Sequence, residues 1–263
     1  MHSNPVLTAR SIEVELGHKT ILSPISFDLR AGEILGIMGP NGAGKSTLLG
    51  ALTREVPLRG GEVVFGGKPI QAWSLEERAQ YLAALPQFTY LQFDFTPNEV
   101  IRMGRTPYPR NRTLDQRVIE RCIEVCDLAG CLSRPYTQLS GGEKQRCQIA
   151  RVLAQLEDPP SRLESKLLLL DEPFSSLDVG HQQALIKHFR RLSERGLAII
   201  LILHDINALA QAADRLLILD KGSCLGIGTP NEIITPVLLK NTFKVDAQIT
   251  KNPITGAPWM NLL

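Results

Sequence analysis

The stretch Gly-Pro-Asn-Gly-Ala-Gly-Lys-Ser-Thr, residues 39–47, decides the fold of this chain of 263 residues. It fills every position of the pattern Gly-x4-Gly-Lys-Ser, in which glycines leave room for a phosphate close to the backbone. Consecutive backbone N–H groups and the start of a helix then offer positive potential to the anion. Lys45 can reach the β- and γ-phosphates, and Ser46 can ligate Mg²⁺. The residues expected to bind the phosphates are Gly39, Pro40, Asn41, Gly42, Ala43, Gly44, Lys45, Ser46 and Thr47.

The residues on either side of this loop supply the strand and the helix that it needs. An apolar run over 33–38 precedes the loop, and the run 47–52 that follows it has helical character. This strand–loop–helix context is typical of nucleotide-binding α/β folds. A glycine-rich turn with a chance lysine is the alternative, and the complete motif with correct flanks disfavours it.

The composition is that of a globular protein. Hydrophobic residues make up 43% of the sequence and charged residues 21%, which with this length suits one large α/β domain or two small ones. The formal net charge of +2 gives no concentrated basic face, so we expect no nucleic acid as a partner. No apolar run approaches the ~20 residues that span a bilayer, and the first residues lack the pattern of a signal peptide.

The five cysteines include no Cys-x-x-Cys pair and favour a reducing cytosol. Cys122 and Cys126 stand four residues apart on an expected helix and could be two ligands of a metal. Because no histidine lies beside them, we expect them to pack as apolar side chains instead.

The first half of the chain divides into strands and then helices. Alternating residues in 6–16 and 25–29 predict a small antiparallel sheet beside the phosphate-binding core. From 88 to about 164 apolar strands disappear. The helices expected there begin at Thr96 and cover 114–128 and 142–156. We therefore predict an inserted helical subdomain.

Apolar runs return in the second half and alternate with helices. The strands are expected at 166–170, 198–203 and 216–219, and the helices at 181–194 and 208–213. Alternating β and α elements predict a parallel sheet, so the fold class is α/β. From 236 onward we expect a short helix and then an extended end.

The pair Asp171-Glu172 directly follows the buried strand at 166–170. The carboxyl ends of strands are where open α/β sheets bind ligands. Asp171 is therefore expected to hold Mg²⁺, and Glu172 to polarise a water for attack on the γ-phosphate.

A second anion-binding helix start is expected at Ser140, Gly141 and Gly142, within Leu-Ser-Gly-Gly-Glu-Lys-Gln-Arg. Two such sites around one γ-phosphate would suit a head-to-tail pair of identical chains. An ordinary serine N-cap followed by flexible glycines is the alternative.

In this order the motifs resemble those of the ATP-binding-cassette (ABC) ATPases, over nearly the whole chain. The resemblance implies that His204 contacts the γ-phosphate and that Gln87 senses Mg²⁺ and the membrane partner. Together with Glu172, these two residues are expected to be catalytic. Residues 175–178, ending in Asp178, match the loop that crosses the dimer interface in that family. The resemblance implies ATP and Mg²⁺ as cofactors, with Ser140, Gly141, Gly142 and Asp178 at the nucleotide.

The resemblance also implies a division of the chain. It predicts a P-loop NTPase domain over 1–240 with a RecA-like parallel sheet and an antiparallel β subdomain, both drawn from 1–87 and 165–235. The helical subdomain is expected at 88–164 and a C-terminal tail at 236–263.

Three positions depart from the family pattern. Leu16 stands where an aromatic residue usually stacks on adenine, with His18 as the nearest ring. Phe174 replaces a common threonine. Cys147 replaces a small aliphatic residue in the signature helix, where we expect it to be buried.

Within the family, the chain resembles ATPases of haem importers in three places. These are residues 93–108, the long link from 151–156 to Asp171, and the ending 252–258. The resemblance implies a homodimer at the cytoplasmic face of the cell membrane, bound to a permease dimer and served indirectly by a haem-binding protein. Several of the aromatic residues Phe88, Tyr90, Phe93, Phe95 and Tyr108 are expected to contact the permease.

Two other functions remain open at this point. An importer of ferric siderophore or cobalamin would use the same chemistry on different cargo. A soluble ABC protein of DNA repair or translation usually carries two cassettes or a long coiled-coil insertion, and the sequence shows neither.

Overall fold

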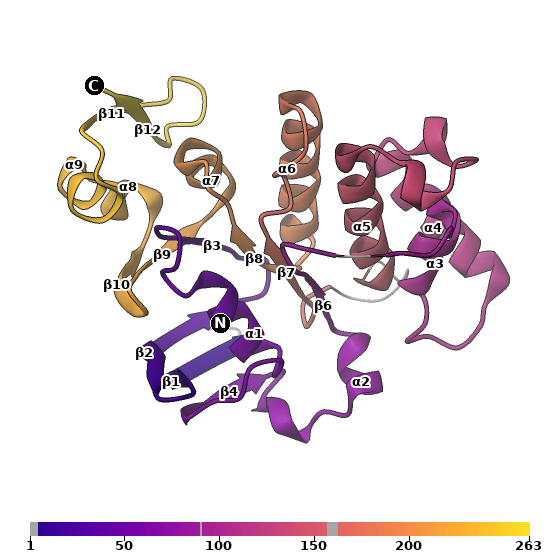
Figure 1. Cartoon of the computed structure of the whole chain (residues 1–263), viewed down its shortest axis with the longest axis horizontal. Helices are drawn as coiled ribbons and strands as arrows, with labels where there is room; N and C mark the ends of the chain where they lie inside the picture. Colours follow the sequence, from indigo (N-terminus) through magenta and orange to yellow (C-terminus); the bar gives the residue numbers. More distant parts are fainter. Residues whose placement is uncertain (1–4, 90, 157–162) are drawn as a thin grey trace.

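The computed structural model describes residues 5–89, 91–156 and 163–263 and is built around a central sheet with strand order β10-β9-β3-β8-β7-β6 (Figure 1). Its strands are β3 (Ile34–Met38), β6 (Leu82–Leu85), β7 (Leu167–Asp171), β8 (Ala198–Ile202), β9 (Arg215–Asp220) and β10 (Ser223–Gly228). Every neighbouring pair from β9 to β6 is parallel, and only β10 runs antiparallel to its neighbour in this sheet. The predicted parallel α/β core is confirmed.

The internal strand β7 lies between two hydrophobic cores. Leu168 and Leu170 pack into the core that contains the helices, whereas Leu167 and Leu169 pack into the core that contains the antiparallel sheet. Side chains alternate across a strand, so a strand buried on both faces needs apolar residues throughout. The run of four leucines follows from that requirement.

The second sheet is antiparallel, with strand order β2-β1-β4-β5. It consists of β1 (Leu7–Leu16), β2 (Lys19–Leu29), β4 (Gly60–Phe65) and β5 (Lys68–Pro69). In Figure 1 it lies on one side of the central sheet, with α1 (Lys45–Leu52) between them. The 3₁₀ turn η1 (Ile70–Ala72) and α2 (Leu75–Ala79) lead from it to β6. The predicted antiparallel sheet is confirmed.

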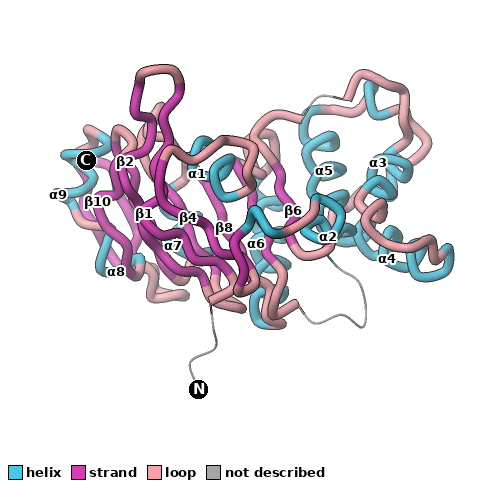
Figure 2. Tube along the Cα trace, turned by 90° about the horizontal axis from the view of Figure 1, so that it is seen from below, coloured by secondary structure: helices cyan, strands magenta, loops and turns pink. Residues whose placement is uncertain are grey.

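Three helices stand beside the edge strand β6 and form the helical subdomain (Figures 1 and 2). They are α3 (Pro97–Met103), α4 (Arg112–Val125) and α5 (Gly141–Leu156), with the 3₁₀ turns η2 (Ala129–Cys131) and η3 (Tyr136–Gln138) between α4 and α5. Thr96 caps α3 with its side chain, as predicted. Cys122, Cys126 and Cys147 are buried in the core of this subdomain, as expected. The exact domain boundaries stay a prediction.

Helices α6 (Val179–Glu194) and α7 (Ile206–Ala212) cover the other face of the central sheet. The C-terminal part contains α8 (Pro230–Ile233), α9 (Pro236–Leu238), the π-helical turn η4 (Leu239–Phe243), β11 (Ala247–Lys251) and β12 (Pro258–Leu262). The extended end expected from sequence pairs with itself as the hairpin β11–β12. Asn207 of α7 holds this hairpin through two hydrogen bonds to the backbone of Met260, at 2.7 and 3.1 Å. In the described part of the chain, no helix combines the length and the apolar character needed to cross a membrane.

Candidate active site

The phosphate-binding loop joins β3 to α1, as the sequence predicts. Gly44 immediately precedes α1 with φ +101°, a conformation that a residue with a Cβ rarely adopts. A Cβ on Gly39 would lie 2.2 Å from the carbonyl oxygen of Leu219, so this position also requires glycine. The loop is thereby packed against β9, whereas a Cβ on Gly42 would meet nothing within 4 Å.

The ammonium of Lys45 is held inside this loop. Its Nζ donates to the carbonyl oxygens of Gly39 (2.8 Å) and Pro40 (3.1 Å), and the residue is only 8% exposed. Burial lowers the pKa of Lys45, and the nearby carboxylates of Glu172 and Asp171 oppose that shift. A phosphate bound by the loop could therefore replace these two backbone carbonyls as the partner of the Lys45 ammonium.

The three residues predicted to hold Mg²⁺ line one cavity of about 300 Å³: Ser46, Gln87 and Asp171. Asp171 is 3% exposed, and its Oδ1 is one of the few buried side-chain atoms in the described residues without a hydrogen-bond partner. Burial raises the pKa of Asp171, and the hydroxyl of Ser46 opposes the shift. A buried carboxylate oxygen with no partner, beside a hydroxyl and an amide, fits a hard divalent cation.

The three residues predicted to be catalytic meet at Glu172. Its Oε1 lies 2.5 Å from His204 Nε2, and its Oε2 accepts from Gln87 Nε2 at 2.9 Å. Glu172 is 9% exposed, and its backbone N–H donates to the Ile202 carbonyl at 3.1 Å. Its φ of +50° is unusual for a residue with a side chain and costs roughly 1 kcal/mol. Residues from the ends of β6, β7 and β8 thus fix one carboxylate in a strained position, which is a common feature of active sites.

The predicted second anion site lies at the first turn of α5. Glu143 Oε2 accepts from the Ser140 backbone N–H at 2.8 Å, and the Glu143 N–H donates to Ser140 Oγ at 3.3 Å. The backbone N–H of Ser140 first, and then the Ser140 hydroxyl and the neighbouring Arg134, lower the pKa of the Glu143 carboxyl to about 2. Glu143 was not among the residues predicted from sequence, although the Ser-x-x-Glu spacing of a capping box indicates its role at this helix start.

The signature residues 140–142 do not reach the phosphate-binding loop of their own chain. Among the described residues, no hydrogen bond or ion pair joins 140–142 to 39–47, and α5 and α1 belong to different parts of the molecule in Figure 1. Gly142 instead packs against the loop 175–178, where a Cβ would lie 2.8 Å from the Ser176 carbonyl oxygen. Asp178 ends that loop as the N-cap of α6.

Two of the three departures from the family pattern have a packing explanation. Phe174 is buried and stacks on Phe189 of α6, with ring centroids 6.1 Å apart. Cys147 is fully buried, and burial raises its pKa to about 12. Leu16 is 49% exposed at the end of β1, next to the turn that carries His18.

The aromatic residues of 88–108 divide between surface and interior. Phe88 and Phe93 are 66% and 70% exposed. Phe95 packs against the core, and the Tyr108 hydroxyl donates to the Gln155 carbonyl at 2.9 Å. Tyr90, and residues 157–162 of the long link that precedes Asp171, lie outside the described residues.

Comparisons with known proteins place these features in one family. The family described as ABC transporter matches residues 22–175. The hemin import ATP-binding protein HmuV of Pseudomonas fluorescens is 41% identical over 96% of this chain and 98% of its own length. The protein of the same name from Gloeobacter violaceus is 40% identical over 96% and 92%. A structure described as an inward-facing conformation of an ABC transporter of the metal-chelate type superposes with a TM-score of 0.79, at 25% identity over 99% of this chain and 98% of that chain. The chain belongs to the ABC transporter family and is an ATPase subunit of that family.

Proposed function

We propose that this ATPase binds Mg²⁺ and ATP between two copies of the chain and uses hydrolysis to drive haem import through a separate membrane permease. The observation that supports haem as the cargo is the similarity to hemin import ATP-binding proteins, which are about 40% identical along nearly the whole chain. The observation that supports the chemistry is the convergence of Gln87 and His204 on Glu172.

The residues of one chain divide into three roles. Lys45 and the backbone N–H groups of the loop bind the phosphates, and Ser46, Gln87 and Asp171 would hold Mg²⁺. The metal, when bound, neutralises charge on the phosphate oxygens. Glu172 is held by two neighbours so that its carboxylate can accept a proton from an attacking water. A cavity of about 220 Å³ lined by Glu172 and His204 could hold that water.

The second copy would complete the site. Ser140 directly precedes a 16-residue helix that begins with Gly141 and Gly142. In the described structure, no hydrogen bond or ion pair joins these three residues to a phosphate-binding residue of their own chain. A head-to-tail dimer would bring this turn onto the γ-phosphate held by the other copy, with Asp178 at the interface.

The permease would dock beside Gln87. Phe88, which follows Gln87 in the sequence, and Phe93 are exposed aromatic side chains that a permease segment could cover. Gln87 lines the cavity with Asp171 and also contacts Glu172, so a permease segment at this surface could sense the nucleotide. In this proposal the ATPase dimer would lie at the cytoplasmic face of the cell membrane, and the haem-binding protein would contact the permease on the opposite side.

The cargo is tested with the complete transporter in liposomes. We expect haem-loaded binding protein to stimulate ATP hydrolysis, while ferric siderophore and cobalamin leave it at the basal rate. The likeness to a transporter described as of metal-chelate type keeps those two as the second candidate. Stimulation by siderophore or cobalamin, with none by haem, would overturn the haem assignment and leave the ATPase assignment intact.

A further inference from the structure

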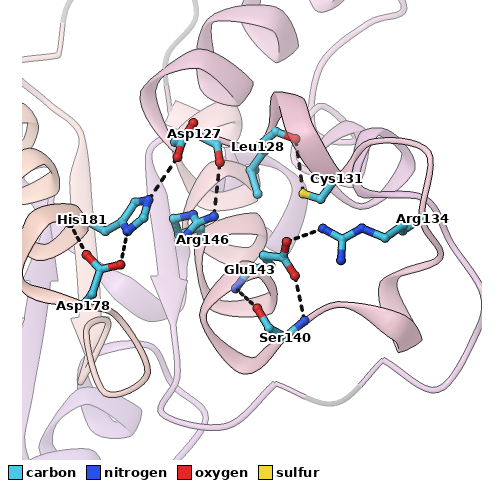
Figure 3. Close-up of polar contacts among 9 residues, drawn as sticks. All are labelled: Asp127, Leu128, Cys131, Arg134, Ser140, Glu143, Arg146, Asp178 and His181. Atoms are coloured by element: carbon cyan, nitrogen blue, oxygen red, sulfur yellow. Dashed lines mark hydrogen bonds and ion pairs between the residues drawn. The ribbon is translucent and has the colours of Figure 1, made fainter.

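A three-residue bridge joins the helical subdomain to the loop that precedes α6 (Figure 3). His181 Nδ1 lies 2.7 Å from Asp178 Oδ2, and His181 Nε2 lies 3.1 Å from Asp127 Oδ2. Asp178 and His181 belong to the start of α6, whereas Asp127 follows the end of α4, more than fifty residues earlier. One imidazole ring therefore links two parts of the fold.

The chemistry of the bridge requires a charged ring. An ionised carboxylate only accepts hydrogen bonds, and a neutral imidazole has a single N–H. With a carboxylate at each nitrogen, only the imidazolium can donate to both. A neutral ring would turn a lone pair toward one carboxylate and lose that half of the bridge.

The backbone conformation at the end of α4 is unusual for a residue with a side chain at the position of Asp127. The Asp127 N–H donates to the Glu124 carbonyl and the Leu128 N–H to the Ile123 carbonyl, at 3.2 and 3.0 Å. These are the two hydrogen bonds of a Schellman motif, in which the position of Asp127 is usually glycine. Asp127 has φ +48°, so a residue with a side chain stands where glycine would be easier.

The bridge is connected to the signature residues by two further contacts. Arg146, on the helix that begins at Gly141, donates to the Asp127 carbonyl oxygen at 3.3 Å. At the other end of the loop, Gly142 packs against the Ser176 carbonyl oxygen. The first turn of α5 is therefore oriented relative to residues 176–181 by two contacts. One is the direct packing of Gly142 on Ser176, and the other runs through Arg146, Asp127 and His181.

We propose that His181 is a positioning residue: its protonated ring ties the helical subdomain to Asp178, and so holds 140–142 in the orientation needed to cover ATP on a second copy. The part of this inference that concerns dimer closure rests on the proposed function. When one half of the bridge is lost, the helical subdomain becomes more mobile. Closure of the dimer must then order the subdomain, and this cost weakens the ATP-bound dimer.

The charged groups around the ring determine the direction of the pH effect. Asp127 and then Asp178 raise the pKa of His181, while partial burial and the guanidinium of Arg146 on α5 lower it; the net shift is upward from the ordinary value of 6.5. The bridge is thus complete below ~6.5 and is lost as pH rises through the raised pKa. Its two carboxylates are 67% and 76% exposed, so each half has a modest effect.

The first experiment follows the ring itself, by nitrogen NMR of the histidine side chains. We expect the titration midpoint of His181 in the full chain to lie above the ordinary value of 6.5, and Asp127→Gly to lower that midpoint. Asp127→Gly suits the backbone conformation and removes only the carboxylate, so a folding defect is avoided. A midpoint at or below the ordinary value, or one unchanged by Asp127→Gly, would overturn the inference whether or not the protein is a haem importer.

The second experiment measures the ATP-dependent dimer by sedimentation in the Glu172→Gln protein, which should not turn over. At about pH 6, His181→Gln should weaken the dimer by about three- to tenfold, as expected for exposed charged contacts, and remove most of its pH dependence. Asp127→Asn should keep the dimer strong at pH 6 and pH 9 alike, because an amide can donate to a neutral ring that donates to Asp178.

His188→Gln, a histidine substitution elsewhere on α6, is the matched control and should keep the pH dependence of the parent. Equal dimer strength in the parent and in the His181→Gln variant at about pH 6 would overturn the positioning role. Failure of the parent Glu172→Gln protein to dimerise at any pH would count against the proposed function and against the closure role together, while the ring titration would still decide on the bridge.

Discussion

Glu172 shows how much a single residue depends on distant segments. The residue type and its place after an apolar strand could be predicted, and so could Gln87 and His204. Their meeting at one carboxylate, with φ +50° at Glu172, could not be read from sequence, because it depends on the parallel register of β6, β7 and β8. Asp127 and His181 were missed for the same reason: neither belongs to a recognised motif, and only the fold brings them together.

Glu172→Gln is expected to abolish turnover without loss of ATP binding. The amide keeps the shape but cannot accept a proton, so phosphate release should fall by about 10²–10⁴-fold while ATP affinity changes little. Phosphate release and fluorescent-nucleotide titration measure the two quantities. A rate near that of the unmodified protein would exclude Glu172 as the base.

Lys45→Ala is expected to weaken ATP binding by at least about tenfold, since a buried charge-assisted contact to phosphate is removed. Equilibrium titration with nucleotide checks this. Unchanged affinity would mean that the ammonium stays on the carbonyls of Gly39 and Pro40 and plays no part in binding.

Cys147 should resist alkylation in the folded protein. Burial raises its pKa to about 12, so almost no thiolate is present near neutral pH, and the residue has no exposed surface. Mass spectrometry after brief iodoacetamide treatment should find Cys147 modified only in denatured protein. Rapid modification of the native thiol would contradict the packing of α5.

At the scale of elements, the helices and strands that have a local sequence signal could be predicted, whereas those that depend on pairing with distant strands could not. The strands at β3 and β7 and the helices α4 and α5 follow from apolar periodicity. Only 25–29 was predicted of β2, which extends over Lys19–Leu29 because its first half also pairs with β1, through irregular register. The hairpin β11–β12 likewise depends on docking to Asn207, which no local pattern reveals.

Ser74 and Thr96 each begin a helix with a capping box, and the two should differ in their effect on stability. Thr96→Ala should lower the free energy of unfolding by ~1 kcal/mol, because α3 buries Val100 and Ile101 and its first turn is part of the core. Ser74→Ala should cost less, because α2 has no buried residue and can fray locally. Urea unfolding of both variants checks the order, and an equal or larger loss for Ser74→Ala would contradict it.

At the scale of the whole molecule, the central claim is that one chain carries two halves of different ATP sites. The phosphate-binding loop leads into α1 in the core, and residues 140–142 lie at the start of α5 in the helical subdomain. No hydrogen bond or ion pair joins the two in the described residues. This separation is what a head-to-tail dimer requires. The sequence motifs implied the two halves, and the fold supports their assignment to different copies.

The most direct test mixes two defective variants, both in the Glu172→Gln background. Lys45→Ala disrupts the phosphate-binding half of the ATP site, and Ser140→Arg disrupts the half that covers ATP on the other copy. Neither variant should dimerise with ATP on its own. A mixture should form heterodimers that retain one ATP per pair, because the intact loop of one copy faces the intact 140–142 of the other. A mixture that stays monomeric, or a Ser140→Arg protein that dimerises alone, would contradict the shared site.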